Sequence, residues 1–131
     1  KIEEIILKIK PSTILTHHVG DLNIDHQIAA RATITAARPF PNSPVKKILS
    51  YETPSSTEWN FDLNESFKPN HYEDVSKFMK IKLKALRAYS GEMRQFPHPR
   101  SLENVISLGK FRGSTVGLKF AEAFRIIRSI K

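Results

Sequence analysis

Apolar residues repeat at helical spacing over residues 2–10, and Pro11 ends this pattern because proline cannot continue a helix. A run of β-forming residues over 13–16 follows and predicts a buried strand entered directly from that helix. After a polar loop, the apolar residues over 28–36 predict a second helix that stops before Pro39. The first part of the chain therefore alternates between helix and strand.

The middle of the chain contains two further predicted strands separated by a long loop. Residues 45–51 predict the first of these strands, after a proline-rich connector. Residues 52–70 form a loop that is long for a plain connection, and such loops are often functional. Residues 71–75 predict a short third strand.

Two helices and one ambiguous segment complete the pattern. Ser76 is the expected N-cap of a helix with an apolar stripe, which ends near Gly91. Ser101 is the expected N-cap of the next helix. Residues 121–127 fit a helix and a short closing strand about equally well, so this segment is left open.

Helices and strands in alternation indicate an α/β fold with a mostly parallel sheet. We expect residues 1–131 to form a single domain, since this length is typical of one. In open α/β sheets, ligands bind outside the carboxyl ends of the strands. Three segments are therefore expected near that edge, namely residues 17–26, which follow the first predicted strand, residues 52–60 and the turn around His98.

The composition is typical of a soluble globular domain, with 40% apolar and 26% charged residues. No apolar run approaches the ~20 residues that cross a bilayer, and we find no secretory signal. The lack of cysteine excludes disulfides and thiol nucleophiles, and it leaves any metal to His, Asp and Glu. We expect a cytoplasmic protein with no membrane partner.

The chain is basic, with 21 Lys and Arg against 13 Asp and Glu and a net charge of +8. Such a charge favours polyanionic partners through phosphate neutralisation. The basic residues are spread along the predicted helices, however, which is typical of solvated helix faces, so we expect no nucleic-acid partner. A non-catalytic basic α/β module that binds nucleic acid or another polyanion stays open as the alternative.

Residues 17–26 concentrate side chains that can bind a metal or transfer a proton. Zinc takes imidazole nitrogen and carboxylate oxygen, and a catalytic zinc needs three protein ligands. The simpler explanation is that these side chains cap the following helix and form an Asx turn. The side chains concerned are His17, His18, Asp21, Asn23, Asp25 and His26.

Four stretches of the sequence resemble, in order, motifs of the PIG-L/LmbE-like zinc-dependent de-N-acetylases. The stretches are residues 16–26 with 36–39, 50–59, 96–101, and 112–113 with 121–124, and together they span nearly the whole chain. The resemblance implies a Rossmann-like three-layer α/β domain. It also implies a single zinc ion and removal of the acetyl group from an N-acetylglucosamine-type sugar or its conjugate.

The resemblance also implies roles for individual residues. His26 matches a zinc ligand, and Asp25 matches the carboxylate that orients catalytic groups. Asn23 stands where many relatives have His; its amide can donate a hydrogen bond to an oxyanion but cannot transfer a proton. The proton donor to the leaving amine is therefore open between His98, whose backbone is fixed by two flanking prolines, and His18.

The family motif of the His-Pro-Asp-Asp type, which supplies the other zinc ligands and the general base, does not occur in this sequence. We therefore expect the chain to be the C-terminal portion of a longer protein and to be inactive when isolated. The expected catalytic residues are Asp25 and His98, with Asn23, His18 and Arg100 in substrate binding. Association into a homo-oligomer is possible in such a protein.

Overall fold

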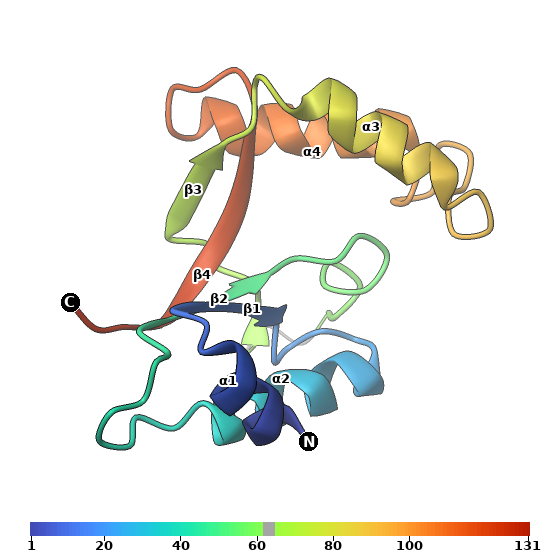
Figure 1. Ribbon diagram of the computed structural model, residues 1–131. Helices are drawn as coiled ribbons and strands as arrows, with labels where there is room; N and C mark the ends of the chain where they lie inside the picture. Colours follow the sequence, from blue (N-terminus) through green and yellow to red (C-terminus); the bar gives the residue numbers. More distant parts are fainter. Residues whose placement is uncertain (62–64) are drawn as a thin grey trace. The chain divides into compact units, whose positions relative to one another are not determined.

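The computed structural model describes residues 1–61 and 65–131, and the chain divides into two compact units. The first unit consists of Lys1–Asn70 with Phe124–Lys131, and the second of His71–Ala123 (Figure 1). Each unit is described by itself below.

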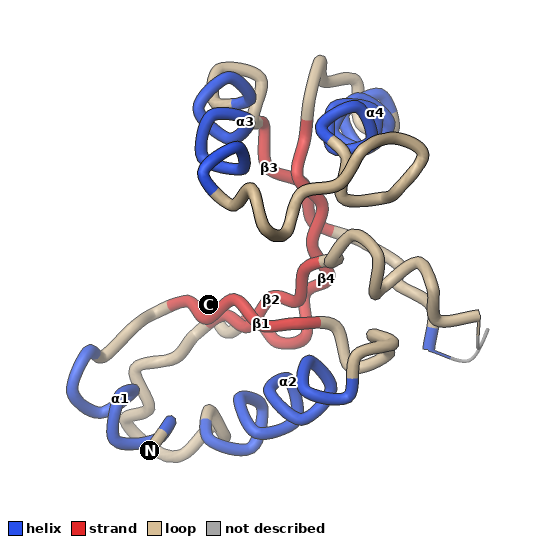
Figure 2. The backbone as a smooth tube through the Cα atoms, turned by 90° about the vertical axis from the view of Figure 1, so that its right-hand side faces the viewer, coloured by secondary structure: helices blue, strands red, loops and turns tan. Residues whose placement is uncertain are grey.

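The first unit is an α/β layer of three strands and two helices. Its elements are α1 (Ile2–Ile9), β1 (Thr13–His17), α2 (Ile24–Ala36), β2 (Lys47–Tyr51) and the C-terminal part of β4 (Ala121–Ser129). β1 pairs in parallel with β2, and β2 pairs antiparallel with β4. α2 packs along β1 and α1 contacts α2, so that both helices lie on the same side of these strands (Figure 2).

The core of the first unit lies between these helices and strands. Ile6 of α1, Val45 just before β2 and Ile48 of β2 are almost fully buried there, with Ala37 at the end of α2. Burying a side chain such as Ile48 contributes about 1.5–3 kcal/mol to folding. The core thus fixes β1 and α2 relative to each other, and with them the loop that joins them.

The second unit contains β3 (His71–Asp74), α3 (Met79–Ala88), α4 (Leu102–Ser114) and the start of β4. α4 contacts both α3 and β3. Gly113 allows the chain to return closely along α4, since a Cβ there would lie 2.7 Å from the Leu118 carbonyl oxygen and 2.9 Å from the Phe120 Cα. Ser101 caps α4 as expected, because its hydroxyl accepts the Asn104 N–H at 3.1 Å.

The sheet is mixed, with the strand order β1-β2-β4-β3, rather than mostly parallel. In the described part of the chain, β1 and β2 are parallel, whereas β2 and β4 are antiparallel. Hydrophobic periodicity identifies a strand but carries no information on its direction, which is why the sequence could not reveal that β4 is antiparallel to β2. The ambiguous segment is a strand, because its backbone pairs with β2 from Lys47 to Tyr51.

Ser76 does not cap α3, which begins after Phe78. The Ser76 hydroxyl instead accepts the Phe120 N–H at 3.2 Å and lies 3.4 Å from the Phe120 carbonyl oxygen. It therefore links the chain before α3 to the chain before β4. Among the described residues, no helix has both the length and the apolarity needed to cross a bilayer.

Candidate functional site

The candidate site lies where the parallel strands β1 and β2 end side by side. His17 is the last residue of β1, and Tyr51, its register partner, is the last residue of β2. The Tyr51 hydroxyl lies 3.2 Å from His17 Nε2, and the Thr53 hydroxyl lies 3.4 Å from His17 Nδ1. Both ring nitrogens of His17 therefore have hydroxyl partners from β2 and the loop that follows it.

His26, in the first turn of α2, stacks on His17. Their ring centroids are 3.9 Å apart and their planes differ by 7°. Burial lowers the pKa of His17, the neighbouring His26 ring lowers it further, and Asp21 opposes both, so the net pKa is below the ordinary value for histidine. The lowered pKa favours the neutral form of His17 in this stack.

Asp21 lies at the centre of the loop between β1 and α2, and its side chain is fully buried. It accepts hydrogen bonds from the hydroxyls of Ser56 and Thr57, the latter at 3.0 Å, and from the Asn23 N–H at 2.9 Å. Its Oδ1 also lies 3.1 Å from Nδ1 of His26. Burial alone would raise the pKa of this carboxyl, but the hydrogen bonds and the nearby imidazole outweigh burial and hold the pKa below its ordinary value.

The loop from residue 52 to 70 packs onto the segment between β1 and α2. The Leu22 N–H donates to the Ser56 carbonyl at 3.1 Å. Gly20 permits this close approach, because a Cβ there would lie 2.1 Å from the Glu65 carbonyl oxygen. The loop thus packs against the candidate site, and its residues 62–64 lie outside the described part of the chain. Its functional role stays a prediction.

His18 is buried next to this loop, with its Nε2 2.9 Å from the Glu65 carbonyl oxygen and its ring edge against Phe67. A pocket of about 200 Å³ adjoins it and is lined also by Ser50 and Arg125. His18 directly follows the last residue of β1, and the loop from residue 52 to 70 holds its ring in place. Its role in substrate binding stays a prediction.

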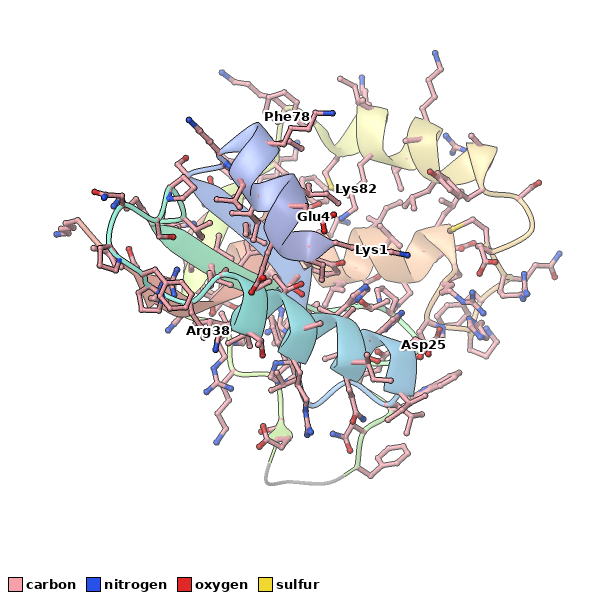
Figure 3. All side chains as sticks on the ribbon, turned by 60° about the horizontal axis from the view of Figure 1, so that its bottom comes forward. Lys1, Glu4, Asp25, Arg38, Phe78 and Lys82 are labelled. Atoms are coloured by element: carbon pink, nitrogen blue, oxygen red, sulfur yellow. The ribbon has the colours of Figure 1, made fainter. Side chains whose placement is uncertain are left out.

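Asn23 and Asp25 lie at the start of α2, where Asn23 is the N-cap. The Asn23 side-chain oxygen accepts the Asp25 N–H at 2.9 Å. Asp25 is exposed at the N-terminal end of the helix (Figure 3). The capping role foreseen for this segment is therefore real for Asn23, and the catalytic role of Asp25 stays a prediction.

His98 and Arg100 belong to the second unit, in a turn after the cis Phe96-Pro97 bond. His98 Nδ1 accepts the Arg100 N–H at 3.0 Å, so the backbone fixes the orientation of this ring. The Arg100 guanidinium donates to the Glu92 carboxylate. This ion pair uses Nη1 of the guanidinium, and the role of Arg100 in substrate binding stays a prediction.

Sequence reasoning missed the part played by Ser56 and Thr57. Both lie in segment 50–59, which matched a family motif, but nothing in the spacing linked their hydroxyls to Asp21. Asp21 was foreseen either as one of the possible metal-binding or proton-transferring side chains or in an Asx turn, and it does make the Asx turn with the Asn23 N–H. The approach of Asp21 to His26 could not be predicted from the sequence, because it depends on how the loop between β1 and α2 folds back.

No family model matches the sequence. The structure is similar to TT1542, a conserved protein of Thermus thermophilus, with a TM-score of 0.74 and 17% identity over 99% of this chain and 58% of that one. It is similar to the N,N'-diacetylchitobiose deacetylase of Pyrococcus horikoshii, with a TM-score of 0.68 and 18% identity over 97% of this chain and 49% of that one. It is also similar to GalB, the 4-carboxy-2-hydroxymuconate hydratase of Pseudomonas putida, with a TM-score of 0.71 and 18% identity over 99% of this chain and 57% of that one.

These similarities show that the chain has an α/β fold found in a deacetylase and in a hydratase. The chain spans about half the length of the deacetylase and under two thirds of the other two proteins. One fold supports different reactions, so the reaction has to be argued from the site residues.

Proposed function

We propose that this chain forms one side of the site of a zinc-dependent de-N-acetylase, as a portion of a longer protein, and that the substrate is an N-acetylglucosamine-type sugar or its conjugate. The observation that carries the proposal is the setting of His26. Its ring lies in polar surroundings at the end of β1, stacked on one imidazole and beside a buried carboxylate. The fold shared with a deacetylase and the order of the four matched stretches support the same function.

The described residues supply only part of a zinc site. Within residues 1–61 and 65–131, no group of three or more His, Asp or Glu side chains could hold a metal ion. His26 fits as a single ligand, because its Nδ1 faces Asp21 and its Nε2 is the nitrogen left for a metal. The remaining ligands and the general base would come from outside this described set.

When bound, zinc polarises an acetamide carbonyl and lowers the pKa of a water molecule. On this chain, His26 would hold the metal from the start of α2, and the exposed Asp25 beside it would orient catalytic groups. The Asn23 amide nitrogen can donate to an oxyanion while its oxygen caps the helix. His98 and His18 remain the two candidates for protonating the leaving amine.

Acetate release from N,N'-diacetylchitobiose and from N-acetylglucosamine conjugates by the full-length protein tests the proposal, because the described residues supply only part of a zinc site. We expect release that a chelator abolishes and zinc restores, and a loss of both activity and bound zinc in His26→Ala. His71→Ala is the matched control, because His71 is a histidine outside the matched motifs that pairs with Glu73 at 2.7 Å. Full zinc content and full activity in His26→Ala would overturn the metal assignment.

Two other outcomes would replace the proposed function. Hydration of a carbon–carbon double bond without acetate release would favour a reaction of the hydratase type. Salt-dependent retention on heparin or DNA, with no effect of zinc, would favour the basic polyanion-binding module instead.

A further inference from the structure

We infer that Asp21 is a positioning residue, which keeps the ring proton of His26 on Nδ1 and so presents the Nε2 lone pair to a metal. Ser56 and Thr57 lock Asp21 in place from the long loop. The part of this inference that concerns zinc binding rests on the proposed function. The contact between Asp21 and His26 is independent of that function. The resemblance to de-N-acetylases gives Asp25 the role of orienting catalytic groups, which differs from the role inferred here for Asp21, the positioning of the His26 ring.

The first support is the choice between the two carboxylates. Asp21 has no exposed surface, and its Oδ1 lies 3.1 Å from His26 Nδ1. Asp25 is exposed, and no contact between its carboxylate and His26 is seen among the described residues. A buried carboxylate beside a ring nitrogen has a much stronger effect than an exposed one, because water screens the latter.

The second support is the state of the Nδ1 atom. It is buried, and within the described part of the chain no hydrogen bond to it is seen; the charged oxygen beside it is Asp21 Oδ1, 3.1 Å away. An ionised carboxylate can only accept hydrogen bonds. A lone pair on Nδ1 would be repelled by it, whereas an N–H there is attracted. The neutral ring is therefore favoured with its proton on Nδ1.

The third support is that both partners are held in place. The Ser56 hydroxyl and the Asn23 N–H bind one oxygen of Asp21, and the Thr57 hydroxyl binds the other at 3.0 Å. The Thr57 oxygen also accepts the Thr53 N–H at 2.7 Å, which ties it to the backbone of its own loop. On the other side, the stack fixes the plane of the His26 ring.

His17 makes this stack a fixed surface. Its two nitrogens are held by the hydroxyls of Tyr51 and Thr53, so its ring cannot rotate without losing both contacts. His26 is thus confined between an imidazole face and a carboxylate. Carboxylate partners of metal-binding histidines act in this way, and their removal costs about 10–100-fold in metal affinity.

The tautomer of His26 can be read directly by long-range ¹H–¹⁵N NMR on the ¹⁵N-labelled chain. The spectra are recorded well above the usual histidine pKa of about 6.5, so that the ring is neutral. His26→Gln assigns the signals. We expect the Nδ1–H tautomer in the wild type and a shift toward Nε2–H in Asp21→Asn. Thr57→Val and Ser56→Ala should shift it in the same direction by less.

Asp25→Asn and Asp74→Asn are the matched controls, since both remove an exposed carboxylate, and they should leave the tautomer unchanged. If circular dichroism shows that Asp21→Asn does not fold, the tautomer of His26 in Thr57→Val is the deciding measurement, because this substitution keeps the shape of the side chain. A wild-type ring with its proton on Nε2 would overturn the inference. So would a change of tautomer in Asp25→Asn but not in the Asp21 and Thr57 variants.

Titration of the full-length protein with zinc chloride separates this inference from the proposed function, because the described residues supply only part of a zinc site. We expect zinc to shift the Nε2 signal of His26 and Thr57→Val to need roughly ten times more zinc for the same shift. A ring that carries its proton on Nδ1 but does not respond to zinc would overturn the metal role and leave the Asp21 contact standing. A ring that binds zinc through Nδ1 would overturn the positioning role and leave the metal role standing.

Discussion

Thr57→Val should destabilise the first unit although it changes neither the size nor the shape of the side chain. The hydroxyl of Thr57 donates to Asp21 Oδ2 at 3.0 Å and accepts the Thr53 N–H at 2.7 Å. A hydrogen bond to a charged group contributes about 1.5–3 kcal/mol and a neutral one about 1 kcal/mol. Because Thr57 is buried, water cannot replace either bond. We therefore expect a loss of about 3 kcal/mol in the free energy of unfolding.

Urea unfolding followed by circular dichroism measures this loss as a lower midpoint with an unchanged slope. Thr57→Ser is the control, since it keeps the hydroxyl and removes one methyl group, and it should lose less than half as much. Equal losses in the two variants would show that the methyl group, not the hydroxyl, is what matters. A loss within ~0.5 kcal/mol in Thr57→Val, the range of ordinary surface substitutions, would refute the reasoning.

Three further predictions concern the same unit. Gly20→Ala should lower the melting temperature, because its Cβ would lie 2.1 Å from the Glu65 carbonyl oxygen, whereas Gly91→Ala should not, since a Cβ there meets nothing within 4 Å. Ile48→Ala should lower the free energy of unfolding by about 2–5 kcal/mol; Ile81→Ala, at a 65% exposed position, should change it little, and equal losses would contradict the placement of the core. The pKa of Asp21 is lower in the folded than in the unfolded state, so its contribution is present above the unfolded value of about 3.9 and is lost as the pH falls through the folded pKa. Acid unfolding curves of wild type and Asp21→Asn should therefore converge at low pH, and a constant difference would contradict the assignment.

The sequence predicted most element positions because the signals for them are local. Pro11 ends α1, the Ser101 hydroxyl caps α4, and the β-forming run at 13–16 lies within β1. The errors have non-local causes. Ser76 has the right chemistry for an N-cap, but its hydroxyl contacts Phe120, 44 residues away. The direction of β4 likewise depends on which strand it meets.

The candidate site was predicted in part for the same reason. The concentration of polar side chains between β1 and α2 is visible in the sequence, and so is the capping of α2 by Asn23. What no spacing rule contains is the pairing of Asp21 with Ser56 and Thr57, 35 and 36 residues away. Local patterns therefore located the site but did not identify the carboxylate that faces His26.

One topological fact does connect the two loops, and it suggests how such pairings can be anticipated. Consecutive parallel strands end at the same edge of a sheet, and the β1–β2 register places His17 beside Tyr51 there. The loop after β2 must therefore start next to the histidine-rich loop after β1. A loop of that length can fold back over its neighbour, and its hydroxyls then supply the donors that a buried carboxylate requires. A length change in residues 52–60 should thus alter the setting of His26, even though His26 lies in α2, far from that segment in the sequence.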